Sequence, residues 1–430
     1  MTSQSVVEQE ADYRPDEVVV ALPHEGSVLA VLHEARGGDL HVDRDELLGL
    51  ARISFDAQAT VQGLSSLDDW ERASEAREAR LPRREDPSEL DQALSGLRAV
   101  LAHRWSGWTP TMGKNRLVAS VEGGGRISGG MVGRISGGMV GRISGGGTAP
   151  VAATRRARLP QGTRPGQGVR VGVLDTGLSP HSRLAGCYAR YSDLLSPEED
   201  AEPRAGHATF IAGLVLSQAP GATVEVRRAL ESDATGDSWS AARKIVQFGR
   251  DGVDVLNLSF LCFTEDDEPP MALAAAIDRL DPAIVVVAAA GNHGAMEDIA
   301  QARPAWPAAL DDVVAVGAVD AAGRHASFSP PENLPWIDVR AQGVDLVSTY
   351  LDEVELGGSQ QFRGFAQWSG TSFAAALVSG AIAAATDPGR VPARAAWDDM
   401  RSALAGPTHP ERTADAARAP LQPVMRLVVP

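Results

Sequence analysis

The feature that most constrains this chain is an unbroken run of small apolar residues in its C-terminal third. Residues 373–385 are mostly alanine, and an Asp-Pro-Gly sequence beginning at Asp387 follows them. A helix that is apolar on every face is buried, so the run predicts a core helix that ends before Asp387. Ser372 directly precedes the run, where the helix dipole and free backbone N–H groups favour negative charge. Ser372 is therefore either a nucleophile or merely the N-cap of this helix.

Upstream of this helix, apolar strands alternate with helical segments. Strands are predicted at residues 169–174, 223–227, 253–259, 283–289 and 313–319, and helices at 207–217, 238–249 and 271–280. Continuous apolar strands that alternate with helices are typical of a parallel sheet covered on both faces. Ligands of such sheets bind outside the carboxyl ends of the strands. Asp175, Ser259 and Asn292 all fall at or just past such ends.

The first 120 residues predict a separate, small α+β domain. Strands are predicted at residues 17–22, 50–55 and 117–121, and helices at 26–35, 67–80 and 90–104. Short strands and amphipathic helices in this mixture are typical of an α+β module. We find no nucleophile with a neighbouring base in it, and its scattered histidines are read as surface or core residues.

A linker at residues 121–164 separates this domain from the remainder, residues 165–430. The sequence GRISGGMV occurs at 125–132 and again at 133–140, and a third copy begins at Gly141. The period is too short and the copies too few for a solenoid, and glycine-rich composition predicts a flexible linker. Residues 123–170 contain arginines and no acidic residue, although the whole chain has a net charge of −16. Expansion by repeat slippage explains the linker equally well without any function.

Composition limits the partners and the compartment. The net charge of −16 argues against a general nucleic-acid or anionic-membrane binder. Cys187 and Cys262 are too few for a disulfide scaffold and are expected to be free thiols. No metal-ligand spacing is present, and we expect no metal or cofactor. Residues 1–18 lack the basic and apolar regions of a secretory signal, and no apolar run could span a bilayer, which predicts a soluble cytoplasmic protein.

Three polar residues complete a possible catalytic set with Ser372. Acyl transfer by a serine needs a base, an acid that orients the base, and donors for the oxyanion. Asp175 ends a buried strand, His207 begins an apolar helix, and Asn292 follows the most apolar strand. Taken singly, Asp175 would more often close a turn, His207 would more often be structural, and Asn292 would belong to a turn. Together, in the order Asp, His, Asn, Ser, they indicate a serine hydrolase.

The segments around these residues resemble those of a known family. Residues from about 165 to 390 are similar to the subtilisin-like serine proteases, the subtilase family. The matching segments are VLDTG (173–177), GHATFIAG (206–213), LNLS (256–259), AAAGNHG (288–294), AVGAV (315–319) and SGTSFAA (369–375). The resemblance implies an α/β fold with a subtilisin-like parallel sheet and helices on both faces. It does not extend to the N-terminal α+β domain.

The resemblance implies a role for each residue of the set. Ser372 would attack the scissile carbonyl, His207 would accept and return the proton, and Asp175 would hold the imidazole tautomer. The side chain of Asn292 and the backbone N–H of Ser372 would form the oxyanion hole. Phe210 replaces a histidine that the family usually carries, and Ala376 replaces a proline.

The walls of the substrate cleft also follow from the resemblance. Ser259, Phe260 and Leu261 are expected on one side, and Ala289, Ala290 and Gly291 on the other. The family usually has glycine where this chain has Leu261. The added bulk lies where substrate should bind, so we expect it to narrow specificity or to move the loop.

Three functions remain open on the sequence. The chain is a serine endopeptidase with an N-terminal regulatory or pro-domain, an inactive protease fold that binds peptides, or a dedicated maturase of one partner peptide. Its partner would be a peptide or protein substrate. A further hypothesis is that the enzyme cleaves its own linker between Glu122 and Leu159. The reason is electrostatic: this basic segment should be attracted to two acidic clusters, 198–202 and 265–268, which are expected near the mouth of the active site.

Overall fold

The fold was analysed in a computed structural model of the 430-residue chain. The structure describes residues 12–36, 38–78, 87–120, 149–157, 165–195, 203–231, 234–295, 302–356, 360–405 and 423–427. The tandem repeat of the linker and the acidic cluster 198–202 lie outside these ranges.

A six-stranded sheet forms the centre of the C-terminal unit, residues 165–430. Its strand order is β13-β12-β11-β9-β6-β7, and every neighbouring pair is parallel. Its strands are β6 (Arg170–Asp175), β7 (Thr223–Arg228), β9 (Val255–Leu258), β11 (Val285–Ala289), β12 (Val313–Val319) and β13 (Val339–Gln342). The order reverses beside β6, because the chain goes from β6 to the edge strand β7 and then returns to β9. This is the predicted subtilisin-like parallel sheet.

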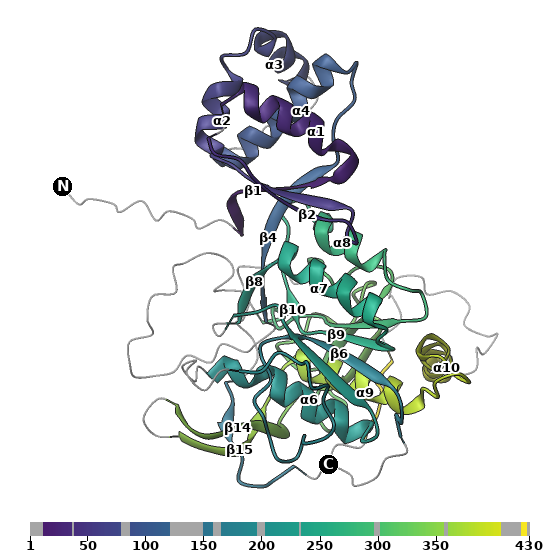
Figure 1. Ribbon diagram of the computed structural model, residues 1–430. Coiled ribbons are helices and arrows are strands. Elements are labelled where there is room, and N and C mark those ends of the chain that lie inside the picture. The colour runs from purple at the N-terminus through teal and green to yellow at the C-terminus, as the bar shows by residue number, and fades with distance from the viewer. Residues whose placement is uncertain are drawn as a thin grey trace.

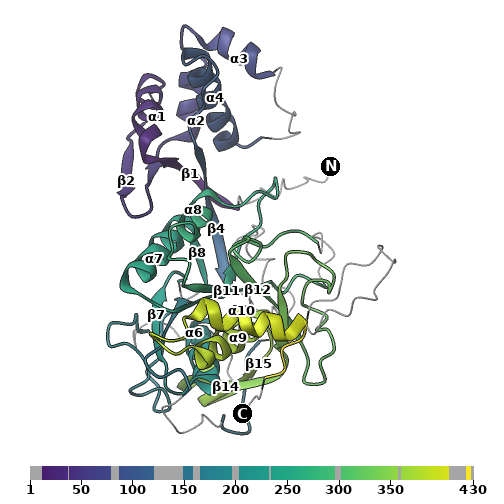
Figure 2. The same ribbon diagram turned by 90° about the vertical axis from the view of Figure 1, so that its right-hand side faces the viewer.

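Helices cover both faces of this sheet. Two helices, α6 (His207–Gln218) and α9 (Thr371–Ala385), pack on one face with alternate strand residues such as Val255 and Val287. On the other face, α7 (Ser238–Asp251) and α8 (Met271–Ile277) pack on the intervening residues such as Leu256 and Val286. The strands read as continuous apolar runs because both faces are buried. Helix α10 (Ala393–Ala405) lies beside α9 (Figure 2).

The N-terminal module, residues 12–120, has a sheet with helices on one face. Its strands are β1 (Tyr13–Ala21), β2 (His41–Asp45), β3 (Leu50–Ser54) and β4 (Met112–Ser120), and its helices are α1 (Leu22–Glu34), α2 (Ala57–Leu64), α3 (Trp70–Glu78) and α4 (Glu89–Arg104). Alternate side chains of β1 pack in two different cores. Val18 and Val20 face the module's own helices, whereas Val19 packs with the residues of α7 and α8. The second face of the module's sheet therefore shares a core with the C-terminal unit.

Strand β4 physically joins the two parts. It leaves the module antiparallel to β1 and continues down into the C-terminal unit (Figures 1 and 2). There it pairs antiparallel with two short strands, β8 (Thr235–Asp237) and β10 (Phe260–Leu261). Strand β4 therefore belongs both to the sheet of the N-terminal module and to a small sheet with β8 and β10 of the C-terminal unit.

A third sheet lies directly before the catalytic-serine candidate in the chain. Its strands β14 (Leu346–Leu356) and β15 (Gln360–Trp368) form a hairpin, and β5 (Val151–Ala152) pairs with β15. The sequence did not predict this hairpin, because its strands mix polar and apolar residues and contain register shifts.

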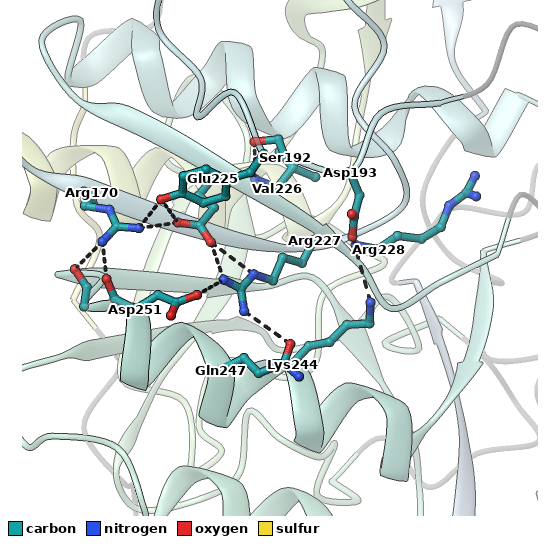
Figure 3. A network of polar contacts seen from close by, with 12 residues as sticks. Arg170, Ser192, Asp193, Glu225, Val226, Arg227, Arg228, Lys244, Gln247 and Asp251 are labelled. Carbon is teal, nitrogen blue, oxygen red and sulfur yellow. Dashed lines mark hydrogen bonds and ion pairs between the residues drawn. The ribbon is translucent and has the colours of Figure 1, made fainter. Parts of the chain in front are cut away.

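A buried ion network fixes the edge strand β7 to β6 (Figure 3). The side chain of Glu225 is 1% exposed and accepts hydrogen bonds from Arg170 Nη2 at 2.5 Å and Arg227 Nη2 at 2.6 Å. Tyr191 also donates to this carboxylate, and Arg227 pairs with Asp251 of α7. A buried carboxylate needs such partners. The network holds β6, whose last residue is Asp175, in register with β7.

Cys187 and Cys262 are both free, and burial raises the pKa of the Cys262 thiol to about 12. None of the helices in the described ranges is long and apolar enough to cross a membrane.

Candidate active site

Asp175 and His207 meet at the carboxyl end of the parallel sheet. Asp175 is the last residue of β6, His207 is the first residue of α6, and both side chains are fully buried. The Nδ1 atom of His207 lies 2.8 Å from Oδ1 and 2.9 Å from Oδ2 of the carboxylate. The backbone N–H of Thr176 donates to Oδ1 at 2.8 Å. The carboxylate thus accepts a hydrogen bond from Nδ1–H, which fixes the tautomer that leaves Nε2 as the basic nitrogen.

Ser372 lies at the second position of α9, in the expected place at the end of the apolar helix. The N-cap of α9 is Gly370, which has no side chain to cap the helix, so Ser372 does not serve as the cap. The ring of Phe373, the next residue, lies 5.5 Å from the imidazole of His207. Trp368, at the end of β15, contacts the same imidazole edge-on at 5.5 Å. Two aromatic rings therefore confine the base beside the helix that carries the serine.

Asn292 joins the end of β11 to the start of α9. Its Oδ1 atom accepts hydrogen bonds from the backbone N of Thr371 at 3.0 Å and from its Oγ1 at 3.1 Å. The hydroxyl of Thr371 also accepts from the backbone N of Gly291 at 3.1 Å. Because Oδ1 is assigned to accept both bonds, Nδ2 is the donating side of the amide. Nδ2 lies 3.3 Å from the position that a Cβ of Gly370 would occupy, beside the N-terminus of α9.

A buried chain of hydrogen bonds connects α9 to one wall of the expected cleft. Ser379, two turns after Ser372, donates to Oδ1 of Asn257 at 3.1 Å. The side-chain amide of Asn257 donates in turn to Oγ of Ser259 at 2.9 Å. Ser379, Asn257 and Ser259 are all 0% exposed. Sequence reasoning did not single out Ser379, because a serine inside an alanine-rich helix carries no local signal.

The two predicted cleft walls begin where neighbouring strands end. Ser259, Phe260 and Leu261 follow β9, and Ala289, Ala290 and Gly291 end or follow β11; β9 and β11 are paired. All six residues are buried. Strand β4 covers the first wall, with Ser120 opposite Phe260 and Ala119 opposite Leu261. The other edge of β4 is bordered by β8, which sequence analysis missed because a Thr-Gly-Asp segment before a helix resembles a turn.

Both described ends of the linker lie against strands of this region. The last residue of β4, Ser120, pairs with Phe260, the residue after Ser259. On the far side of the linker, β5 pairs with Ala366 and Gln367 of β15, the strand whose last residue contacts His207. The chain between Ser120 and Val151 therefore has to connect two strands that flank the candidate active site.

Charged residues of the module contact the acidic cluster 265–268. Lys114 Nζ lies 3.0 Å from Oε1 of Glu265, and Arg116 pairs with the other oxygen of the same carboxylate. Burial opposes ionisation of Glu265, but Arg116 and Lys114 outweigh it and lower its pKa to about 2. In the same cluster, Asp267 pairs with Arg303. This cluster therefore binds β4 and a loop of its own unit, so it gives no support for attraction of the basic linker.

The fold and the sequence motifs agree with known proteins. The family model of the subtilase family matches residues 166–409, more than half of the chain. The chain belongs to the subtilase family. No group of three or more His, Cys, Asp or Glu in the described residues is placed to hold a metal ion.

Individual relatives show how far the likeness extends. Subtilisin BL of Lederbergia lenta is 33% identical over 227 residues, which are 51% of this chain and 76% of that protein. The thermophilic serine proteinase of Bacillus sp. (strain AK1) is 32% identical over 239 residues, 53% of this chain but only 54% of the relative. The crystal structure of fervidolysin from Fervidobacterium pennivorans, described as a keratinolytic enzyme related to subtilisin, superposes with a TM-score of 0.59. The superposition covers 97% of this chain and 61% of fervidolysin. The sequence identity over it is 15%, so it shows a likeness of fold alone.

Proposed function

We propose that the chain is a serine endopeptidase in which Asp175, His207 and Ser372 form the catalytic triad. The contact of His207 Nδ1 with both oxygens of Asp175, beside the helix that carries Ser372 in its first turn, is the observation that carries this proposal. His207 removes the hydroxyl proton of Ser372 as Ser372 attacks the peptide carbonyl, and later donates it to the leaving amine. Asp175 stabilises the imidazolium that forms between these steps.

The side-chain amide of Asn292 and the backbone N–H of Ser372 stabilise the oxyanion in this proposal. Support for the role of Asn292 comes from its two hydrogen bonds to Thr371, which immobilise the amide before any substrate arrives. Donors that are held in place need no reorganisation when negative charge develops, and this is the main source of their effect.

The N-terminal module blocks the cleft in the intact chain. Strand β4 pairs with both β8 and β10, and an extended substrate would add to these same edges. All residues of the proposed triad are 0% exposed, as this arrangement requires. Peptide hydrolysis by the intact chain then needs β4 to leave.

The same placement supports cleavage within the chain. The window between Glu122 and Leu159 begins two residues after Ser120, the last residue of β4. Strands β4 and β5, which precede and follow residues 121–148, both pair with strands that flank the site. We propose that the enzyme cleaves itself in this window, by proximity rather than by charge.

A fluorophosphonate probe with intact-mass analysis tests the mechanism. Wild type adds one phosphonyl group at Ser372, whereas Ser372→Ala and His207→Ala add none. Ser217→Ala is a matched control, because Ser217 is also a buried helical serine and its hydroxyl bonds within its own helix, to the carbonyl of Leu214 and the side chain of Gln218. An unlabelled wild type that folds and binds peptides would instead identify an inactive protease fold.

Self-processing is tested by the N-terminus of the purified protein. Wild type is expected to begin between Glu122 and Leu159, and Ser372→Ala to keep its original N-terminus. Identical clipping of the Ser372→Ala variant would assign the cut to another protease and contradict self-processing.

A further inference from the structure

The strand β4 shows how an extended peptide aligns with the cleft wall. Ala119 lies directly opposite Leu261, and Ser120 lies opposite Phe260. Residues that face each other in an antiparallel pair project their side chains to the same face, and successive residues alternate. A peptide bound in this register has its next residue opposite Ser259, on the same face as Leu261. Ser259 is connected through Asn257 to Ser379 of α9, the helix that carries Ser372, so in the proposed complex this peptide residue supplies the carbonyl to be cleaved.

The packing of the wall confirms this alternation. Phe260 belongs to the core beneath α7, together with Val118 of β4. Leu261 belongs to the opposite core, together with Phe263 and Ala289. Leu261 therefore points into the space between the two cleft walls, where the side chain that precedes the cleaved bond has to go.

This space is already occupied by side chains of the enzyme. A Cβ built on Gly291 would lie 2.9 Å from Cδ2 of Leu261 and 2.7 Å from Nδ1 of His293. Leu261 and His293 are both 0% exposed, and Phe263 packs edge-on against the imidazole at 5.0 Å. The two walls therefore touch through Leu261 and His293 over Gly291. A side chain that entered between the walls at this point would therefore meet Leu261 and His293.

We propose that Leu261 and His293 restrict this enzyme to peptides with a small uncharged residue, glycine, alanine or serine, before the cleaved bond. This inference rests on the proposed endopeptidase function and specifies its substrate class. A large side chain would have to displace well-packed groups, and a lysine or arginine would lose its hydration beside Leu261, Phe263 and His293, none of which is acidic. Glycine and serine make up most of residues 123–147, so the linker itself offers bonds of the required kind.

The test is a series of peptides that differ only before the cleaved bond. Each carries the sequence Val-Ala-Ser of residues 118–120 followed by Gly, Ala, Ser, Val, Phe or Lys, and kcat/KM is measured with the full chain after incubation to release the module. Wild type is expected to cleave after Gly, Ala and Ser roughly 100-fold faster than after Phe or Lys. Leu261→Gly is expected to raise cleavage after Phe, relative to Ala, by about tenfold or more. Leu47→Gly, a matched change at an exposed leucine of the module, keeps the wild-type order.

Labelling of Ser372 by a fluorophosphonate with a small alkyl group separates the two levels of the proposal, because this reaction needs no residue before the cleaved bond. A labelled enzyme that cleaves after Phe or Lys as fast as after Ala would overturn the specificity and leave the peptidase function intact. An enzyme that stays unlabelled and inactive after its module has been released would overturn both. His293→Ala provides a second variant if Leu261→Gly does not fold, and is also expected to improve cleavage after Phe. The wild-type profile decides the inference even if neither variant folds.

Discussion

The ammonium of Lys114 lies 3.0 Å from the carboxylate of Glu265, although the two residues are 151 positions apart. Lys114 belongs to β4 of the N-terminal module, and Glu265 to the loop that follows the cleft wall. Lys114 also contacts Asp91 at 2.9 Å, and its side chain is only 5% exposed. A charge pair as buried as this one is specific to the docked module, since each partner would be hydrated if the module left.

Removal of the charge at Glu265 is therefore expected to release the module. In Glu265→Gln, Lys114 and Arg116 lose their shared carboxylate, and a hydrogen bond to a charged group is worth about 1.5–3 kcal/mol. The full-length protein should react with a fluorophosphonate at least about tenfold faster than wild type. Asp267→Asn is the control on the same loop, because Asp267 pairs with Arg303 and is half exposed. Equal rates for Glu265→Gln and wild type would show that this contact does not restrain the module.

The same contact predicts a pH dependence. Docking lowers the pKa of Glu265 from its ordinary value of 4.5 to about 2, despite the opposing effect of burial. The ionised form therefore favours docking, and its contribution is complete above pH 4.5 and is lost as the pH falls towards 2. Asp12, whose pKa is raised by burial and by Glu265, titrates with the opposite sign.

The measurement is hydrogen exchange of β4 between pH 6 and pH 3, made in Ser372→Ala to prevent proteolysis. Protection of β4 should fall towards pH 3. Because Asp12 is present in both proteins, the comparison with a protein that also carries Glu265→Gln isolates Glu265. A fall of the same size in both proteins would assign the pH dependence to other groups.

Asn292→Asp separates the donor of the proposed oxyanion hole from the structural role of the side chain. The carboxylate keeps an acceptor for Thr371 but loses the Nδ2 donor and adds negative charge near the oxyanion. We expect kcat to fall by at least about 100–1000-fold, the range that loss of one oxyanion donor costs in subtilisin, with KM little changed. Steady-state kinetics on one peptide checks this, and a kcat within about tenfold of wild type would exclude Asn292 from the oxyanion hole.

Ser379→Ala is expected to weaken the connection between α9 and the cleft wall. The substitution leaves the buried Oδ1 of Asn257 without the hydroxyl of Ser379, which costs about 1–3 kcal/mol of the free energy of unfolding. Denaturant unfolding in the Ser372→Ala background measures the loss. Ser217→Ala serves as the control, because the hydroxyl of this buried serine bonds only to Leu214 and Gln218 of its own helix and makes no contact with the cleft wall. An equal, small effect of both substitutions would contradict a role for the buried chain.

The network around Glu225 makes a prediction about stability alone. Glu225→Gln removes a buried charge shared by Arg170 and Arg227, and breaking a buried ion pair costs about 3–5 kcal/mol. Asp251→Asn removes a 40% exposed partner of the same Arg227 and is expected to cost less than about 1 kcal/mol. Denaturant unfolding of both variants, again in the Ser372→Ala background, checks the difference.

The sequence predicted most of the parallel sheet and the residues at its carboxyl ends. Runs such as 285–289 are apolar throughout because both faces of the strand are covered. Burial can therefore be recognised from consecutive residues of the sequence. The same local pattern located Asp175 after one strand and Asn292 after another. In the structure, Asp175 is hydrogen-bonded to His207, and Asn292 to the residue before Ser372.

Contacts between distant segments carried no such local signal. Neither the pairing of β4 with β8 and β10 nor the Lys114–Glu265 contact has a sequence pattern, because each depends on which surface of the module meets the C-terminal unit. Leu261 illustrates the division. The sequence alone showed a leucine at a position of the expected cleft wall where the resemblance implies glycine, but only tertiary packing decided that its side chain meets His293 over Gly291. Side-chain direction in a strand depends on register, and the register is fixed by the partner strands rather than by neighbours in the chain.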